Sequence, residues 1–215
     1  MYDTILFDLD GTLTDPGIGI TNSVMYALKK YSITVTDRSQ LYRFIGPPLI
    51  ESFETFYGFS HEQAVESVGF YREYYRDRGI YENRVYEGIP ALLDRLKSAG
   101  RRLLLATSKP EEFAVRILEH FELLKYFDIA AGAAMDETRT AKADVIAYAL
   151  GLAGIKDPCS CIMVGDRKHD ILGAKAQSMA SMGVLFGYGS LSELEEAGAD
   201  LIADTVEDIG RLLGV

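Results

Sequence analysis

The chain has 215 residues, 48% of them hydrophobic and 25% charged, which is long enough to bury the core of one large domain or of a domain with a smaller insertion. Its net charge of −10 argues against nucleic acid or an anionic membrane surface as a partner, because both attract basic patches. No stretch approaches the roughly 20 apolar residues of a membrane span.

The first predicted element is a short buried strand over residues 5–7, which acidic residues follow at once. Asp8 and Asp10 are two positions apart, so on an extended chain their side chains leave the same face, and Gly11 lets the backbone turn away. Two carboxylates held this close repel each other unless a cation or a proton lies between them. An Asp-Gly pair is also typical of an ordinary turn, and this stretch alone is compatible with both readings.

Residues 15–85 carry apolar side chains at helical spacing and no strand pattern. The spacing predicts helices over 18–31, 41–45, 49–57 and 60–78. This stretch is therefore expected to form a small all-helical unit that interrupts the chain directly after the first strand. An insertion there leaves from the ligand-binding edge of a sheet and can fold back over it as a lid.

From residue 86 on, helical and strand patterns alternate. Helices are predicted over 90–99, 110–121, 142–150, 170–177, 193–197 and 206–213, and strands over 102–107, 127–130, 161–165, 182–186 and 200–203. This alternation predicts an α/β fold, a doubly wound parallel sheet with helices on both faces. The expected domains are an α/β core of residues 1–14 and 86–215 and a helical cap of residues 15–85.

Two hydroxyls end the strand predicted over 102–107. Ser108 precedes Glu111 by three positions and Pro110 by two, a pattern that a helix-capping box with proline in the first turn would also produce. Thr107 has no such structural explanation. Because helix N-termini hold anions, we favour a phosphate contact for Thr107.

The strand predicted over 161–165 also ends in acids, Asp166 and Asp170. Together with Asp8 and Asp10 they form a set of carboxylates that needs a cation, and oxygen ligands in that number suit Mg²⁺. Lys142 precedes another helix; taken alone it is an ordinary solvated lysine. Beside an acid cluster and a bound phosphate, it becomes a candidate for neutralising both.

In combination these residues resemble the haloacid dehalogenase superfamily of phosphatases. Asp8-Leu9-Asp10-Gly11-Thr12 matches the first motif of that superfamily, and Gly165-Asp166-x-x-x-Asp170 matches its acidic motif. Thr107 and Lys142 match its hydroxyl and lysine motifs. The segments 44–49, 107–110 and 165–170 look most like the phosphoglycolate phosphatase branch, and the insertion looks like a helical cap of the first type.

The resemblance implies hydrolysis of a phosphomonoester in two steps. Asp8 would be the nucleophile that forms an aspartyl phosphate, and Asp10 the acid and then the base. Thr107 and Lys142 would bind the phosphate oxygens. Mg²⁺ would be held by the Asp8 carboxylate, the backbone carbonyl of Asp10, Asp166 and, directly or through water, Asp170. The expected substrate-binding residues are Gly11, Thr12, Ser108, Lys109, Arg43 and Gly46, with Arg43 or Lys109 meeting a second anionic group.

Several other functions fit similar residues. A 5'-nucleotidase or a pyrophosphatase of the same branch would share the whole site. A phosphomutase similar to β-phosphoglucomutase would return the phosphoryl group to a sugar. A receiver-like signalling module also combines clustered acids, a hydroxyl, a lysine and Mg²⁺, but the helical insertion argues against it.

Cys159 and Cys161 are too close in the chain for a favourable structural disulfide, and we interpret them as free thiols in a reducing compartment. The first residues show no basic region before an apolar run, so no signal peptide is expected. The expected protein is cytoplasmic, a monomer or homodimer, with a small phosphorylated metabolite as its partner and neither nucleic acid nor membrane.

Overall fold

The computed structural model describes residues 2–136 and 138–215. The chain divides into two compact units, one comprising the chain up to Thr14 and from Val85 to Val215, the other Asp15–Arg84. Val85 thus belongs to the larger unit, whereas the sequence-based boundary placed it in the smaller one. No helix among the described residues is long and apolar enough to cross a membrane.

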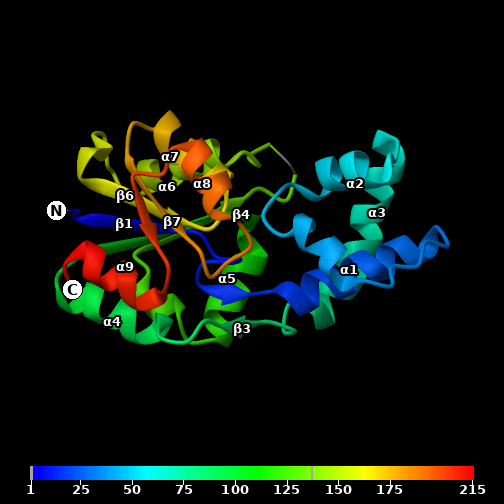
Figure 1. The fold of residues 1–215 in the computed structure, drawn as a ribbon, viewed down its shortest axis with the longest axis horizontal. Coiled ribbons are helices and arrows are strands. Elements are labelled where there is room, and N and C mark those ends of the chain that lie inside the picture. Colours follow the sequence, from blue (N-terminus) through cyan, green and yellow to red (C-terminus); the bar gives the residue numbers. More distant parts are fainter. Residues whose placement is uncertain (1, 137) are drawn as a thin grey trace. The chain divides into compact units, whose positions relative to one another are not determined.

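The larger unit contains a six-stranded sheet in the order β5-β4-β1-β6-β7-β8, and the strands pair in parallel (Figure 1). The strands are β1 (Thr4–Phe7), β4 (Arg102–Pro110), β5 (Ile129–Ala133), β6 (Cys161–Gly165), β7 (Ala180–Val184) and β8 (Leu201–Ala203). From β1 the sheet grows first toward β5 and then, in the other direction, toward β8. The carboxyl end of β1 therefore lies where the strand order reverses, the usual place for a ligand in such a sheet.

Helices cover both faces of this sheet, which confirms the predicted α/β class (Figure 1). On one face lie α6 (Lys142–Leu152), α7 (Lys168–Ala176) and α8 (Leu191–Ala197). Of these, α6 contacts α7, and α7 contacts α8. On the other face are α4 (Ile89–Ser98), α5 (Glu111–His120) and α9 (Val206–Leu213), with α4 against α9 and the short 3₁₀ helix η3 (Leu124–Tyr126) between α4 and α5. Because the sheet grows in opposite directions on the two sides of β1, right-handed connections, the rule for parallel strands, would put the connecting helices α4 and α5 on one face and α6, α7 and α8 on the other.

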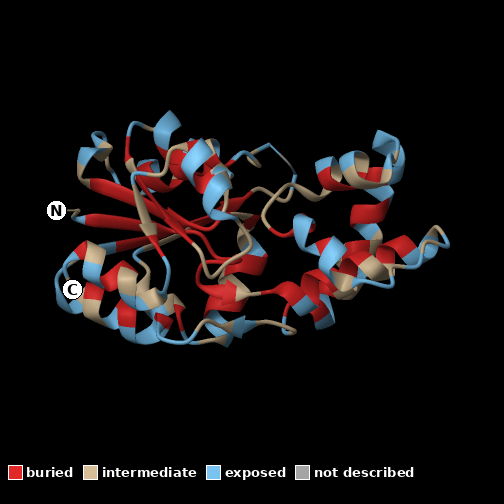
Figure 2. Ribbon diagram, viewed as in Figure 1, coloured by how far each residue is buried: buried red, intermediate tan, exposed pale blue. Residues whose placement is uncertain are grey.

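The alternation of side chains along β1 decides toward which face of the sheet each of its residues points. Leu6 belongs to the buried cluster shared with α6 and α7, whereas the ring of Phe7 meets Phe127, which follows η3 on the opposite face. The strands are buried along most of their length, as expected for a parallel sheet covered on both sides (Figure 2). By the same alternation, the residue after Phe7 points toward α6 and α7.

The smaller unit consists of α1 (Gly17–Lys30), the 3₁₀ helix η1 (Arg38–Phe44), α2 (Leu49–Tyr57), α3 (His61–Tyr74) and the π-helical turn η2 (Tyr75–Gly79). Aromatic rings fill its interior, with Phe53 stacked on Phe59 and edge-on to Phe44. Two short strands, β2 (Thr14–Asp15) and β3 (Arg84–Val85), pair at its ends. These strands were not predicted, because two residues are too few to show a periodicity.

The structure corrects several local predictions. The helix predicted over 41–45 is 3₁₀ and longer, and the helix predicted over 60–78 divides into α3 and η2. β4 continues through Ser108 to Pro110 and α5 begins at Glu111, so Ser108 is not a capping residue. The helix predicted over 142–150 continues through Gly151 to Leu152, and the left-handed turn comes at Gly154.

One exposed ion pair connects α4 to the sheet and gives a prediction about acid stability. Asp128 Oδ2 accepts hydrogen bonds from the backbone N–H of Leu103 (2.9 Å) and from Lys97 Nζ (3.0 Å). Although burial acts in the opposite direction, these two donors lower the pKa of Asp128. A lowered carboxyl pKa stabilises the fold above the unfolded-state pKa, and the stabilisation is lost as the pH falls through the folded-state value.

We therefore expect Asp128→Asn to lower the free energy of unfolding at pH ~7 by at most about 1 kcal/mol, given the partial exposure of the pair. The difference from the wild type should shrink below about pH 4, where the wild-type carboxylate also takes up a proton. Urea unfolding at both pH values tests this. The exposed Asp144→Asn on α6 is the matched control; an equal deficit for Asp128→Asn at both pH values would contradict the explanation.

Candidate active site

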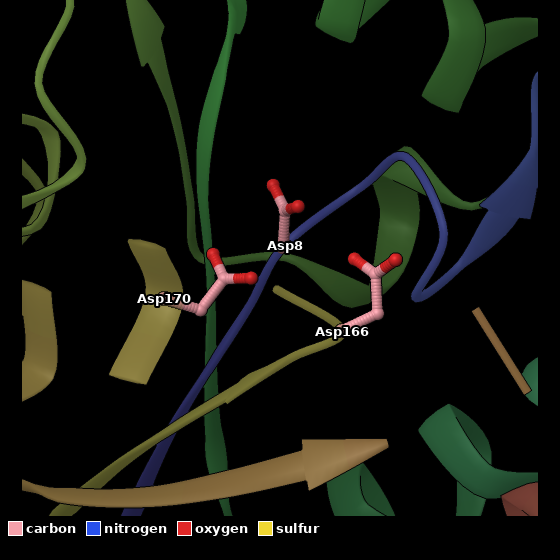
Figure 3. A group of neighbouring side chains, drawn as sticks. All are labelled: Asp8, Asp166 and Asp170. Atoms are coloured by element: carbon pink, nitrogen blue, oxygen red, sulfur yellow. The ribbon is translucent and has the colours of Figure 1, made fainter. Parts of the chain in front are cut away.

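The site is built around Asp8, the first residue after β1. Its backbone N–H donates to the carbonyl of Val164 on β6 over 2.9 Å, so it extends the ladder by one residue. Its side chain leaves on the same face as Leu6, toward the beginnings of α6 and α7. There the carboxylate meets those of Asp166 and Asp170, and one oxygen of each lies within 4.8 Å of the others (Figure 3).

Asp166 and Asp170 are held by backbone N–H groups. Asp166 directly follows β6, and its Oδ2 accepts from the N–H of Tyr188 over 2.7 Å. Asp170 is the third residue of α7, and its Oδ2 accepts from the N–H of Arg167 over 3.1 Å. Asp170 thus caps its own helix with one oxygen and turns the other toward Asp8. The side chain is thus placed both to cap the helix and to take part in the acidic cluster.

Lys142, the first residue of α6, supplies positive charge to this cluster. Its Nζ lies 2.7 Å from Asp8 Oδ1, 2.8 Å from Asp170 Oδ1 and 3.1 Å from the carbonyl oxygen of Ala106. Only 7% of the residue is exposed, so it is not the ordinary solvated lysine that its local sequence suggests. Burial opposes its charge, but Asp170 and Asp8 outweigh burial and raise the pKa of Lys142.

The cluster still lacks positive charge. Burial, together with the nearby charges of Asp170 and Asp8, raises the pKa of Asp166 well above its usual range. Burial also raises the pKa of Asp170, against the opposing effect of Lys142. One ammonium facing three carboxylates leaves two negative charges uncompensated when all are ionised. A bound cation would compensate this excess.

The donor set fits Mg²⁺. It consists of carboxylate oxygens, the hard ligands that Mg²⁺ prefers, on three elements of a rigid sheet edge. Asp166 Oδ1 is buried and has no hydrogen-bond partner among the described residues, as expected of an oxygen reserved for another ligand. The carboxylate of Asp10 does not join the cluster, so only the backbone carbonyl of Asp10 stays a predicted ligand.

Asp10 is instead paired with Lys109. Lys109 Nζ lies 2.5 Å from Asp10 Oδ2, so each acid of the first motif has its own lysine. Burial raises the pKa of Asp10, and the charge of Lys109 partly offsets that effect. Thr107 lies beside this pair, and its Oγ1 accepts from the backbone N–H of Lys109 over 3.2 Å. Accepting that bond leaves the hydroxyl proton of Thr107 available to donate, which a phosphate contact requires.

The turn after Asp10 is shaped by close packing against Asp166. Gly11 has a φ of +85°, and a Cβ there would lie 2.2 Å from Asp166 Oδ2. Only glycine fits both the left-handed conformation and the space. Thr12 is fully buried, and its Oγ1 has no hydrogen-bond partner among the described residues.

Sequence reasoning missed one part of the site, the loop of residues 186–190 after β7. The N–H of Tyr188 binds Asp166, and a Cβ on Gly187 would lie 2.4 Å from Asp166 Cβ and 2.3 Å from the carbonyl oxygen of Gly11. This loop therefore closes against both acidic motifs. The signal in the sequence was the run Gly187-Tyr188-Gly189-Ser190 at the end of a predicted strand.

We expect Gly187→Ala to move the loop away from Asp166, because backbone on one side and the Asp166 side chain on the other leave no room for a methyl group. The hydrogen bond from Tyr188 should weaken, and the variant should bind Mg²⁺ at least about tenfold more weakly, as for other losses of a group that orients a ligand. Titration calorimetry measures this. Gly151→Ala, where a Cβ would meet nothing, is the control, and equal affinities would contradict the assigned role.

Three candidates from the sequence remain, namely Ser108, Arg43 and Gly46. Ser108 is half-buried within β4. Arg43 and Gly46 belong to the helical unit, where the Arg43 guanidinium lies 4.3 Å from the centre of the Phe56 ring and Gly46 lies in the bend after η1. Their roles in substrate binding stay predictions.

The chain is similar to several known proteins. A model of the haloacid dehalogenase-like hydrolases matches residues 5–184. A 5'-nucleotidase of Pseudomonas aeruginosa is 48% identical over 193 residues, which cover 90% of this chain and 87% of that protein. The tyrosine-protein kinase PtkA of Mycobacterium tuberculosis is 38% identical over 214 residues, 98% of this chain and 72% of that one.

Among solved structures, the crystal structure of a predicted phosphatase from Clostridium acetobutylicum matches with a TM-score of 0.96 and 46% identity, and the match covers 100% of both chains. The family resemblance found in the motifs is thereby confirmed. The chain belongs to the haloacid dehalogenase-like hydrolase family.

Proposed function

We propose that this protein is a Mg²⁺-dependent phosphomonoester hydrolase that acts through an aspartyl phosphate on Asp8. The observation that carries the proposal is the placement of the Asp8 carboxylate at the reversal point of the sheet, between Lys142 and the acids Asp166 and Asp170. A nucleophilic carboxylate must be desolvated, oriented and free of a full set of hydrogen bonds, and it must face a site that tolerates a dianionic phosphate.

In the first step an oxygen of Asp8 attacks phosphorus, and the bond from phosphorus to the ester oxygen breaks. Lys142 fixes the carboxylate through Oδ1 and contributes positive charge beside the phosphoryl oxygens. The Thr107 hydroxyl donates to another of these oxygens. Both groups act where negative charge is spread in the transition state.

Asp10 moves the proton in both steps. Its carboxyl group gives a proton to the departing ester oxygen, so the alcohol leaves neutral, and Asp10 becomes a carboxylate. It then takes a proton from the water that attacks the phosphorus of the aspartyl phosphate. Phosphate is released, Asp8 is again a carboxylate and Asp10 is again protonated, which balances the cycle.

Asp8, Asp166, Asp170 and the backbone carbonyl of Asp10 are the residues that would hold Mg²⁺. When bound, the ion neutralises the two excess negative charges and lowers the repulsion between Asp8 and the phosphate. The acids already lie within 4.8 Å of one another, so little reorganisation is needed.

The substrate is proposed to be a small phosphorylated metabolite. The 5'-nucleotidase relative favours nucleoside 5'-monophosphates, and the motif segments favour phosphoglycolate. The relative named tyrosine-protein kinase makes a phosphoryl acceptor other than water worth testing. Free thiols at Cys159 and Cys161 support a cytoplasmic enzyme, which we propose is a monomer or homodimer.

A phosphate-release panel tests the proposal. The purified chain should release inorganic phosphate with Mg²⁺ from at least one of p-nitrophenyl phosphate, adenosine 5'-monophosphate, phosphoglycolate or pyrophosphate. Glucose 1-phosphate and a tyrosine-containing peptide with ATP serve as transfer controls. Sugar-phosphate isomerisation or peptide phosphorylation without phosphate release would overturn the hydrolase proposal.

Metal removal should affect stability as well as activity. Dialysis against EDTA is expected to abolish phosphate release, and adding Mg²⁺ at about 100 times its Kd should restore it and stabilise the fold by about 2.7 kcal/mol. Differential scanning calorimetry measures the second effect without a substrate. The variant Asp166→Asn should lose most of the Mg²⁺-induced shift; a full shift in that variant would remove Asp166 from the metal site.

A further inference from the structure

A buried ion pair joins the ammonium of Lys109 to the carboxylate of Asp10. Lys109 Nζ lies 2.5 Å from Asp10 Oδ2, and the two side chains are 5% and 9% exposed. Charges shielded from water in this way form a stable pair only in close, well-defined geometry, since they lose their hydration. The contact therefore restricts the carboxylate of Asp10 to one orientation.

The shape of β4 explains how Lys109 reaches Asp10. The register of β4 against β5 shifts between Ala106 and Pro110, and within this irregular stretch the N–H of Lys109 donates to Thr107 Oγ1. Irregularities of this kind at strand ends re-aim side chains. The same local feature thus places the Thr107 hydroxyl and directs the Lys109 side chain.

The two oxygens of Asp10 are unequal as a result. Oδ2 is held by Lys109, whereas Oδ1 is buried and has no hydrogen-bond partner among the described residues. A buried oxygen without a partner is costly unless another ligand or reactant completes its hydrogen bonding. Oδ1 is therefore the oxygen that can carry a proton, give it to the ester oxygen and recover one from water, while Oδ2 keeps its contact with Lys109.

We propose that Lys109 is the positioning residue of the acid–base group: it holds Asp10 Oδ2 and thereby directs Oδ1 to the ester oxygen in the first step and to water in the second. This inference rests on the proposed phosphatase function. It differs from the expectation that Lys109 meets a second anionic group of the substrate, because the contact that the structure shows for the ammonium is with Asp10.

A leaving-group series separates this role from the alternatives. p-Nitrophenolate departs without a proton, whereas phenolate depends more on a proton from Asp10. Values of kcat/KM report the steps up to leaving-group departure, so they isolate the acid role. We would compare p-nitrophenyl phosphate, phenyl phosphate and p-carboxyphenyl phosphate, the last carrying a second anion on the same ring.

For Lys109→Met we expect the ratio of kcat/KM for p-nitrophenyl phosphate to that for phenyl phosphate to rise about tenfold or more above the wild-type ratio. Lys109→Arg, which keeps a cation, should stay closer to the wild type. An unchanged ratio for Lys109→Met would show a purely structural role, and a selective loss of p-carboxyphenyl phosphate would show a substrate contact. Either result overturns the inference.

A double-mutant cycle shows whether Lys109 acts through Asp10. In the Asp10→Asn background, Lys109→Met should not change the ratio further; an additional change would overturn the inference. Circular dichroism verifies that each variant is folded. If Lys109→Met does not fold, Lys109→Gln takes its place in the same comparison. If the wild-type protein hydrolyses no aryl phosphate, the result contradicts the proposed function. If the wild type is active but the Lys109 variants leave the ratio of kcat/KM values unchanged, the result contradicts only this inference.

Discussion

The variant Asp8→Asn is expected to lose phosphate release by about 10³-fold or more in kcat while keeping its fold. Asparagine has the same size as aspartate and still offers an oxygen to Lys142 Nζ, but its amide is not a nucleophile that can form an acyl phosphate. Phosphate release from p-nitrophenyl phosphate with Mg²⁺ measures the loss.

Stability provides a second measure for the same variant. Asp8→Asn removes one of three clustered carboxylates, so like-charge repulsion decreases, and in EDTA the thermal midpoint should equal or exceed that of the wild type. Asp8→Ala controls for reversion of asparagine to aspartate by deamidation. Retention of more than a trace of Mg²⁺-dependent turnover in Asp8→Ala would remove Asp8 as the nucleophile.

The variant Lys142→Ala is expected to affect both stability and catalysis. It leaves Asp8 and Asp170 without the ammonium that lies 2.7 and 2.8 Å from them, and breaking a buried ion pair from one side costs about 3–5 kcal/mol. Loss of a charge beside the phosphoryl oxygens should also lower kcat/KM by about 10²–10³-fold. Urea unfolding and initial rates measure the two effects.

The pH dependence of that variant has a defined sign. Without Lys142 the buried carboxylates bind protons more tightly in the folded than in the unfolded state, so the stability of the variant falls as the pH rises. Its deficit relative to the wild type should widen between about pH 5 and about pH 8. The exposed Lys156→Ala is the control, and a pH-independent deficit with normal kcat/KM would exclude Lys142 from the cluster.

Much of the secondary structure of the larger unit was predictable because each of these helices and strands has a recognisable pattern in its own stretch of sequence. β6 and α9 have the predicted bounds, since a continuous apolar run and an amphipathic pattern are local properties of the sequence. The short strands β2 and β3, the irregular end of β4 and the π-helical turn η2 were not predicted. The hydrogen bonds of these elements depend on partners that a local sequence pattern does not identify.

The candidate site divides in the same way. The sequence by itself determined that carboxylates and a hydroxyl end the first, second and fourth strands of the core, and parallel strands bring such ends to one edge. Only the tertiary structure decided that Lys142 pairs with Asp8, 134 positions away in the chain, and that Lys109 pairs with Asp10. It also decided that the loop of residues 186–190 packs against Asp166. Periodicity follows from neighbours in the chain, whereas the partner of a buried charge depends on which helix begins opposite which strand, and that is fixed only when the sheet is assembled.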